Sequence, residues 1–175
     1  NKSAPIVLAP GDLFLNADFG YQPLPAAGLN SVGDTVWFDA DGDGTQTASE
    51  YGIAGVTIAL VADSNGNGVI DAGEPYIATD VTDDIGNYLF EDLADGNYIV
   101  VVTDSNNILD GLDPSYDADD GTTSPDEMSA VDLDSAGSNS TSIDDRMQDF
   151  GYTPADQQPN TGLIGDSIFF DNNQD

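Results

Sequence analysis

Two twelve-residue stretches of this chain carry oxygen-bearing side chains at the spacing of a calcium-binding loop. The first, DADGDGTQTASE, spans Asp39–Glu50, and the second, DSNGNGVIDAGE, spans Asp63–Glu74. Both fit the pattern D-x-[DN]-x-[DN]-G-x5-E, in which alternate side chains point inward and a glycine at position 6 permits a sharp turn. Because Ca²⁺ needs about six to eight oxygen ligands at about 2.3–2.6 Å, the pattern predicts one calcium ion in each loop.

The predicted ligands occupy positions 1, 3, 5, 7, 9 and 12 of each loop. In the first loop they are Asp39, Asp41, Asp43, the carbonyl of Thr45, Thr47 and Glu50. In the second loop they are Asp63, Asn65, Asn67, the carbonyl of Val69, Asp71 and Glu74. Mg²⁺ fits less well, because it requires a tighter octahedron and retains its waters. An ordinary acidic turn is the alternative for either loop, but two complete matches favour calcium.

A third acidic turn follows at residues 117–121, DADDG. The carboxylates of Asp117, Asp119 and Asp120 could hold a third calcium ion. Further carboxylates that could assist lie nearby in the sequence: Asp113, Asp126, Asp132 and Asp134. The spacing does not define the ligand set here, and a solvated acidic turn explains it equally well.

The charge of the chain restricts its partners. It has 33 acidic residues, 2 basic residues and a net charge of −31 at pH 7. Such a surface repels nucleic acids and anionic membrane surfaces, attracts cations, and repels itself on folding unless ions screen or bind it. No apolar run approaches about 18 residues, so no membrane insertion is expected.

The residue types also argue against an enzyme. The chain has no cysteine and no histidine, which excludes disulfides, thiolate metal sites, the usual zinc ligand and the usual general base. A pair of carboxylates can hydrolyse glycosides, but in a chain this rich in aspartate any single pair carries no information. We therefore expect no catalytic activity.

Short apolar runs predict the elements that position these loops. They are Thr35–Phe38, Val56–Val61, Tyr88–Phe90, Tyr98–Thr103 and Met147–Tyr152, each bounded by Gly, Asn or Asp. No convincing helical period is present, so an all-β, two-sheet sandwich is expected. Strands rather than helices flank both loops, which predicts calcium clips on a β scaffold with a structural role, and not a sensor that swings helices.

The sequence repeats itself over a long interval. ADFGYQP at 17–23 recurs as QDFGYTP at 148–154, and SVGDTVWFDADGD at 31–43 recurs as LIGDSIFFDNNQD at 163–175. The offsets, 131 and 132 positions, predict that each repeat is a whole domain. The alternative is one larger domain with two internally similar edges.

This repeat predicts five segments in the chain. They are 1–21, the closing segment of a preceding repeat; 22–31, a linker; 32–152, the complete repeat; 153–163, a second linker; and 164–175, the opening segment of the next repeat. Neighbouring copies are expected to complete the two flanking fragments, either along a continuous chain or by strand exchange, in a tandem array or filament.

The order of motifs resembles a known family. VGDTVWFDADGDG, GIAGVTIAL, TDDIGNYLFEDLADGNYIVVV and DFGY occur in the order seen in the B-type repeats of serine–aspartate-repeat surface adhesins, the SdrD B-like domains, which belong with the wider collagen-adhesin B-type (Cna-B-like) domains. The resemblance covers about residues 32–152 and both flanking fragments. It implies a prealbumin-like, Ig-like β-sandwich with calcium-binding loops, repeated in tandem on the outside of a microbe as a stalk or spacer.

The chain departs from the family pattern in three places. Thr47 stands where the family often has Asp, so position 9 would use the hydroxyl or a water. The loop 63–74 is often a plain turn in relatives. Some relatives cross-link Lys to Asn, but Lys2 is the only lysine here, so no such isopeptide can form within 32–152 and calcium would take over this stapling role.

A calcium-dependent carbohydrate- or protein-binding module is the alternative function. It would need an aromatic platform or pocket, and core packing explains the single tryptophan, Trp37, better than a platform does. Tyr21, Tyr51, Tyr76 and Tyr116 could be exposed. A host, cell-surface or glycan target is therefore kept as a second class of partner beside neighbouring repeats.

Overall fold

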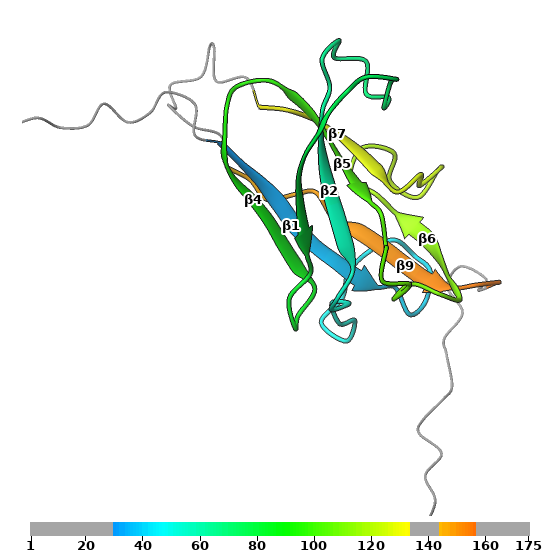
Figure 1. Cartoon of the computed structure of the whole chain (residues 1–175). Coiled ribbons are helices and arrows are strands. Elements are labelled where there is room, and N and C mark those ends of the chain that lie inside the picture. Colours follow the sequence, from blue (N-terminus) through cyan, green and yellow to red (C-terminus); the bar gives the residue numbers. More distant parts are fainter. Residues whose placement is uncertain (1–29, 134–143, 157–175) are drawn as a thin grey trace, which may run out of the picture.

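The computed structural model describes residues 30–133 and 144–156, in which every regular element is a β-strand (Figure 1). The strands are β1 (Asn30–Phe38), β2 (Thr57–Ala62), β3 (Tyr76–Val81), β4 (Asn87–Leu93), β5 (Asn97–Val102), β6 (Leu112–Tyr116), β7 (Met128–Asp132), β8 (Asp144–Asp145) and β9 (Phe150–Pro154). A search of these residues finds no helix that could cross a membrane.

The strands form two sheets. The first has the order β4-β1-β9-β6, with β8 also pairing with β1, and the second has the order β3-β2-β5-β7. The first and last long strands are parallel neighbours: Val36 lies opposite Phe150 and Phe38 opposite Tyr152. The all-β, two-sheet sandwich expected from the sequence is therefore confirmed.

Alternating apolar side chains fill the space between the sheets. Ile58 and Leu60 of β2, and Val100 and Val102 of β5, meet Val36 and other residues of the first sheet in one core cluster. This alternation follows from the two-residue period of a strand, which sends every second side chain to the same face. Trp37, 1% exposed, lies next to Gly151, where a side chain would collide with the indole. Trp37 is therefore buried, although it is not part of the core cluster between the sheets.

Each of the five predicted runs overlaps a strand, while four strands were not predicted. The overlapped strands are β1, β2, β4, β5 and β9. The strand β3, YIATDV, has a half-polar sequence, and β6, LDPSY, contains a proline that an edge strand tolerates. The strand β7 is only five residues long and β8 only two. Partner strands rather than local sequence define these four elements.

The ends of the folded unit lie close to the predicted limits. The strand β1 begins at Asn30 and β9 ends at Pro154, so strands extend two residues beyond each end of 32–152. The predicted flanking segments, 1–21 and 164–175, and most of both linkers lie outside the described residues.

The parallel pairing of β1 and β9 gives the unit an entry pole and an exit pole. At the entry pole β1 begins, and Asn30 lies opposite Leu93 at the end of β4. The loop 63–74 joins β2 to β3 at this pole, since Ala62 lies opposite Tyr98 near the start of β5. At the exit pole β1 and β9 both end, and the loop 39–50 follows β1 there (Figure 1). The two predicted calcium loops therefore occupy opposite poles.

Candidate metal centres

The loop 39–50 is organised around the carboxylate of Asp39. Asp39 is fully buried at the end of β1, and its N–H donates to the carbonyl of Tyr152 (2.8 Å). Its carboxylate accepts the N–H groups of Gly42 (2.7 Å), Asp43 (3.2 Å) and Gly44 (2.9 Å). Both glycines have positive φ, 70° and 72°, which lets the chain curl back around the carboxylate.

The next two predicted ligands converge on Asp39. One carboxylate oxygen each from Asp39, Asp41 and Asp43 lie within 4.8 Å of one another. Two oxygens bound to one Ca²⁺ at about 2.4 Å are at most about 5 Å apart, so this spacing fits a single ion. Partial desolvation, together with the charge of Asp43, raises the pKa of Asp41. A bound cation would relieve that repulsion.

Glu50 closes the loop at position 12. One carboxylate oxygen accepts the N–H of Ala40 (2.9 Å) and the other accepts the N–H of Thr47 (2.7 Å). The N–H of Glu50 in turn donates to the carbonyl of Thr47 (3.0 Å). The hydroxyl of Thr47 lies 3.0 Å from that of Ser49. Glu50 therefore joins the first and last thirds of the loop.

The loop 63–74 is organised in the same way around Asp63. The buried carboxylate accepts the N–H groups of Gly66 (2.7 Å), Asn67 (3.3 Å) and Gly68 (2.9 Å). These N–H groups, that of Gly68 most strongly, lower the pKa of Asp63. Glu74 closes the loop by accepting the N–H groups of Ser64 (2.8 Å) and Asp71 (2.9 Å).

The two loops share one hydrogen-bond scheme, position by position. In both, the carboxylate at position 1 accepts the N–H groups of positions 4, 5 and 6. The side-chain oxygen at position 3 accepts the N–H of position 5, and that at position 5 accepts the N–H of position 7. The carboxylate at position 12 accepts the N–H groups of positions 2 and 9. Two loops from different parts of the fold thus adopt one conformation.

The loops differ in the charge of their ligands. In the second loop the amides of Asn65 and Asn67 donate to one oxygen of Asp71, at 2.8 and 3.0 Å, so positions 3, 5 and 9 converge there too. The second loop has three carboxylates among its predicted ligands and the first has four. Both donor sets consist of oxygen atoms once the two amides turn their oxygens inward, which is the set that Ca²⁺ prefers.

The third acidic turn is arranged differently. Asp117 is fully buried, and its carboxylate accepts the N–H groups of Asp120 (3.0 Å) and Asp126 (2.7 Å). Burial raises the pKa of Asp117. The carboxylate of Asp119 accepts the N–H of Ala130 in β7 (3.0 Å). In the described part of the chain, the acidic side chains grouped closely enough for one ion are Asp39, Asp41 and Asp43, and this turn is not among them.

Three of the four additional carboxylates considered for this third site lie within the described residues. Asp126 contributes an N–H to Asp117, Asp113 is exposed on β6, and Asp132 lines a small cavity beside Asp63. Asp134 lies outside the described residues. The turn itself lies near the first loop, because a side chain on Gly44 would collide with Thr122.

A carboxylate pair was not singled out from the sequence. Asp149 accepts the N–H of Thr35 (3.2 Å), and burial, together with the charge of Asp34, raises the pKa of Asp149 to about 6. Burial also raises the pKa of Asp34. Both residues lie in the repeated motifs: Asp34 in the GDT that recurs as GDS at 165–167, and Asp149 in the DFGY that also occurs at 18–21. No local pattern links the two motifs to each other.

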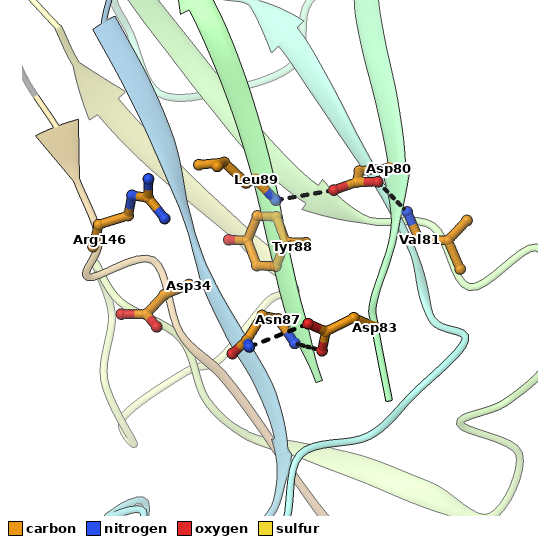
Figure 2. A pocket seen from close by; sticks show the side chains of 8 residues that line it. All are labelled: Asp34, Asp80, Val81, Asp83, Asn87, Tyr88, Leu89 and Arg146. Atoms are coloured by element: carbon orange, nitrogen blue, oxygen red, sulfur yellow. Dashed lines mark hydrogen bonds between the residues drawn. The ribbon is translucent and has the colours of Figure 1, made fainter. Parts of the chain in front are cut away.

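A cavity of about 560 Å³ lies beside Asp34, one member of this pair (Figure 2). It is lined by Asp34, Asp80, Val81, Asp83, Asn87, Tyr88, Leu89 and Arg146. Asp80 accepts the N–H groups of Val81 and Leu89, and Asp83 accepts those of Ile85 and Asn87. The N–H groups of Asn87 and Ile85 lower the pKa of Asp83. The two carboxylates therefore fix the β3–β4 connection, which gives them a structural role.

Three of the four tyrosines considered for a binding platform lie within the described residues. Tyr51 is 63% exposed and stacks on Phe38 with ring centroids 5.2 Å apart. Tyr76 is also exposed, and Tyr116 is half-buried. Tyr21 lies outside the described residues. The Phe38–Tyr51 stack is adjacent to the first loop, since these residues immediately precede and follow it.

Comparison with known proteins places this geometry in context. The model of a family described as the SdrD B-like domain matches residues 30–152. The serine-aspartate repeat-containing protein I of Staphylococcus saprophyticus is 40% identical over 86 residues, which are 49% of this chain and 4% of that protein. A fibrinogen-binding protein of Staphylococcus epidermidis is 40% identical over 86 residues, 49% of this chain and 7% of that protein.

The chain thus spans only a small part of the curated relatives that it matches. Among solved structures, the shaft pilin SpaA of Lactobacillus rhamnosus overlaps with a TM-score of 0.42 and 13% identity, covering 72% of this chain and 51% of the pilin.

Proposed function

Because this chain belongs to the family of SdrD B-like domains, we propose that it contains a calcium-stabilised structural repeat, a stalk or spacer, of an extracellular adhesin or surface filament. The calcium part of the proposal is supported by the common hydrogen-bond scheme of the loops 39–50 and 63–74. Both loops carry the spacing D-x-[DN]-x-[DN]-G-x5-E and fold in the same way, and this spacing supplies the oxygen ligands that Ca²⁺ prefers.

The energetics favour a stabilising role for the ions. A ligand present at 1,000 times its dissociation constant stabilises a fold by about 4 kcal/mol, while a domain as a whole is stable by about 5–15 kcal/mol. The chain has no cysteine for a disulfide, and its only lysine, Lys2, precedes the described domain. Calcium would bind seven carboxylates in the two loops and so offset part of the repulsion within a chain of net charge −31.

The stalk part of the proposal is supported by the family and by the poles of the fold. Repeats joined from the exit pole of one to the entry pole of the next would extend as a rod. The curated relatives include serine-aspartate repeat-containing proteins and a fibrinogen-binding protein, so we place this chain at the cell surface, with neighbouring repeats as its main partners and a host protein as a target of the whole molecule.

Thermal unfolding of the chain 1–175 tests the role of calcium. The midpoint is measured in excess calcium and then in chelator, at one fixed high ionic strength so that general screening is equal in both. We expect a large fall of the midpoint in chelator that added calcium reverses and added sodium does not. An unchanged midpoint would contradict the proposal and would assign both loops to ordinary acidic turns.

Substitutions at position 12 connect the effect to the loops. Glu50→Gln and Glu74→Gln each remove one carboxylate that would bind calcium bidentately, and each is expected to reduce the calcium-dependent part of the midpoint shift. Glu91→Gln is the matched control, because Glu91 is an exposed glutamate of β4 outside both loops. If the calcium-dependent midpoint shift is the same in all three variants, the stabilisation does not arise from these loops.

A calcium-dependent binding module is the second candidate, and the exposed Phe38–Tyr51 stack beside the first loop favours it. Calcium would then order a platform for a carbohydrate or protein. In that case Tyr51→Ala would abolish binding to a glycan or host-protein array while leaving the calcium dependence of the unfolding midpoint unchanged, and chelator would abolish this binding as well.

A further inference from the structure

The chain contains two Asn-Gly dipeptides, and both lie in the loop 63–74. They are Asn65-Gly66 and Asn67-Gly68, at positions 3 to 6 of that loop. Asparagine followed by glycine is the dipeptide most prone to spontaneous deamidation, because glycine has no Cβ to keep its backbone nitrogen away from the preceding side chain. In the loop 39–50, aspartate stands at both equivalent positions. Of the two loops, only the second can therefore undergo this reaction at positions 3 and 5.

Deamidation needs only the asparagine, the following glycine and water. The backbone nitrogen of the glycine attacks the side-chain amide carbon of the asparagine, and a new C–N bond forms between them. The bond from that carbon to the amide nitrogen breaks, and ammonia leaves with the proton that the backbone N–H gave up. Water then opens the resulting cyclic imide at either of its carbonyl groups. The product is an aspartate or an isoaspartate, and both carry a new carboxyl group.

In the closed loop, both attacking nitrogens are fixed by the carboxylate of Asp63. The N–H of Gly66 donates to one oxygen of this carboxylate (2.7 Å), and the N–H of Gly68 donates to the other (2.9 Å). Hydrogen bonds to an ionised carboxylate are stronger than those between neutral groups. Each nitrogen is therefore held toward the centre of the loop and must leave this position before it can react.

The two side-chain amides are fixed as well. Asn65 and Asn67 both donate to one oxygen of Asp71, at 2.8 and 3.0 Å. The amide oxygen of Asn65 accepts the N–H of Asn67 (3.1 Å), and that of Asn67 accepts the N–H of Val69 (2.9 Å). Each amide is thus bound through its nitrogen and through its oxygen. Rotation of an amide toward the following glycine would break these hydrogen bonds.

Solvent reaches these dipeptides even when the loop is closed. Asn65, Gly66 and Asn67 are exposed, and Gly68 is half-buried. The water that opens the imide is therefore already present, and the opening of the loop limits the reaction. Local opening of such a segment costs less free energy than unfolding of the whole domain.

We propose that Asn65 and Asn67 form a deamidation site that the closed loop protects and that reacts when the loop loses its calcium. The calcium part rests on the proposed function, because an ion bound among Asp63, Asp71 and Glu74 would hold the loop closed. Each reaction adds one carboxylate at the entry pole and is not reversed when calcium returns. A period without calcium is thereby recorded as a covalent change in the second loop.

Peptide mapping by mass spectrometry tests the proposal after the chain 1–175 has been incubated in excess calcium, in chelator and in urea. Calcium at about 100 times its dissociation constant lowers the population of the open loop about a hundredfold, so we expect deamidation of Asn65 and Asn67 to be at least about tenfold slower in calcium than in chelator. The rate in urea gives the value for the open chain. Asn107 is the internal reference, because it is exposed but precedes Ile108, and it should stay intact. Equal rates in calcium and chelator, or equal deamidation of Asn107, would overturn the proposal.

Two substitutions of the same type assign the protection to the second loop. Glu74→Gln weakens the closure of this loop at position 12, so we expect it to raise the deamidation rate of Asn65 and Asn67 in calcium severalfold. Glu50→Gln is the matched control, because it makes the same change at position 12 of the first loop and should leave that rate unchanged. If Glu50→Gln accelerates the reaction as much as Glu74→Gln, deamidation follows unfolding of the whole domain and the proposal fails. It also fails if neither variant accelerates the reaction.

The unfolding midpoint separates this proposal from the proposed function. If the midpoint depends on calcium and the deamidation rate does not, calcium stabilises the domain without protecting the two asparagines, and only the present proposal fails. If neither the midpoint nor the rate depends on calcium, both proposals fail.

Discussion

The fold disfavours ionisation of the Asp149 carboxylate. Burial and the charge of Asp34 raise its pKa to about 6, against a usual value of about 3.9. Between about pH 4 and pH 6 the native state therefore binds more protons than the unfolded state, so the free energy of unfolding decreases as the pH rises through this window.

Asp149→Asn is expected to remove this cost while retaining an oxygen for the N–H of Thr35. At pH 7 the free energy of unfolding should rise by about 1 kcal/mol, a value well below the full pKa difference because the side chain is partly exposed. At about pH 4 the variant and the parent should differ little. Urea unfolding at both pH values measures this, with Asp113→Asn, an exposed carboxylate of β6, as control. An equal gain at both pH values would contradict the expectation.

Ligand charge distinguishes the two loops. The first loop offers four carboxylates and the second three, so we expect the first to bind calcium more tightly. Asn65→Asp would give the second loop its fourth carboxylate and is expected to tighten its calcium affinity by about tenfold. Calorimetric titration of the parent and the variant measures this. Asn107→Asp adds the same charge at an exposed position outside both loops and should leave the affinity unchanged.

The conformation of each loop could be predicted from the sequence because the residues that form it are contiguous. Twelve residues with fixed spacing contain almost all the information that folds the loop around Asp39 or Asp63. The pair formed by Asp34 and Asp149 could not be predicted. Asp149 is 114 positions from Thr35, the residue that follows Asp34, and only the parallel pairing of β1 and β9 brings them together.

At the scale of elements, the β3–β4 connection is fixed where two glycines cross. Gly86 has φ +85°, and a side chain there would collide with the carbonyl of Val36 and the backbone of Gly52. The carbonyl of Gly86 accepts the N–H of Val36 (2.9 Å), and the carbonyl of Val36 accepts the N–H of Ile53 (2.7 Å). Three segments are therefore joined at one close approach.

Gly86→Ala is expected to lower the free energy of unfolding by about 3 kcal/mol, because it adds steric overlap to the strain of positive φ. Gly111→Ala is the matched control. Gly111 has φ +86° but nothing within 4 Å of an added side chain, so only the strain of about 1 kcal/mol remains. Denaturant unfolding of both variants measures the difference. Equal effects would show that the crossing tolerates a methyl group.

Strands with β-branched and aromatic runs could be predicted, and the others could not. The strands β2 and β5 each place four buried residues in six positions, so their local sequence is decisive. The strand β6 contains Pro114 and β8 has two residues, and these elements exist because β9 and β1 pair with them. Such pairing depends on residues distant in the sequence.

At the scale of the whole molecule, like charge opposes folding. The chain has a net charge of −31, and the single cationic side chain within the described residues, Arg146, pairs with Asp144 (2.6 Å). We expect the unfolding midpoint in chelator to rise by several degrees when sodium chloride increases, because screening weakens the repulsion. The shift should be smaller in saturating calcium. A midpoint in chelator that does not respond to salt would contradict this.

The two-sheet architecture could be predicted from the number and spacing of the strands. The order of strands in each sheet could not, because it depends on which distant segments pair. The shared motifs at 17–23 and 148–154 indicate that DFGY closes a unit, but not that β9 lies beside β1.

The parallel pairing of β1 and β9 has a mechanical consequence. The chain enters at the start of β1 and leaves at the end of β9, at opposite poles, so tension between these points pulls the two strands past each other along their length. The hydrogen bonds that join them are loaded together and must break together, instead of opening one after another as in a hairpin pulled from its ends. A tethered surface molecule built from such units would resist stretching by flow until this single set of bonds yields.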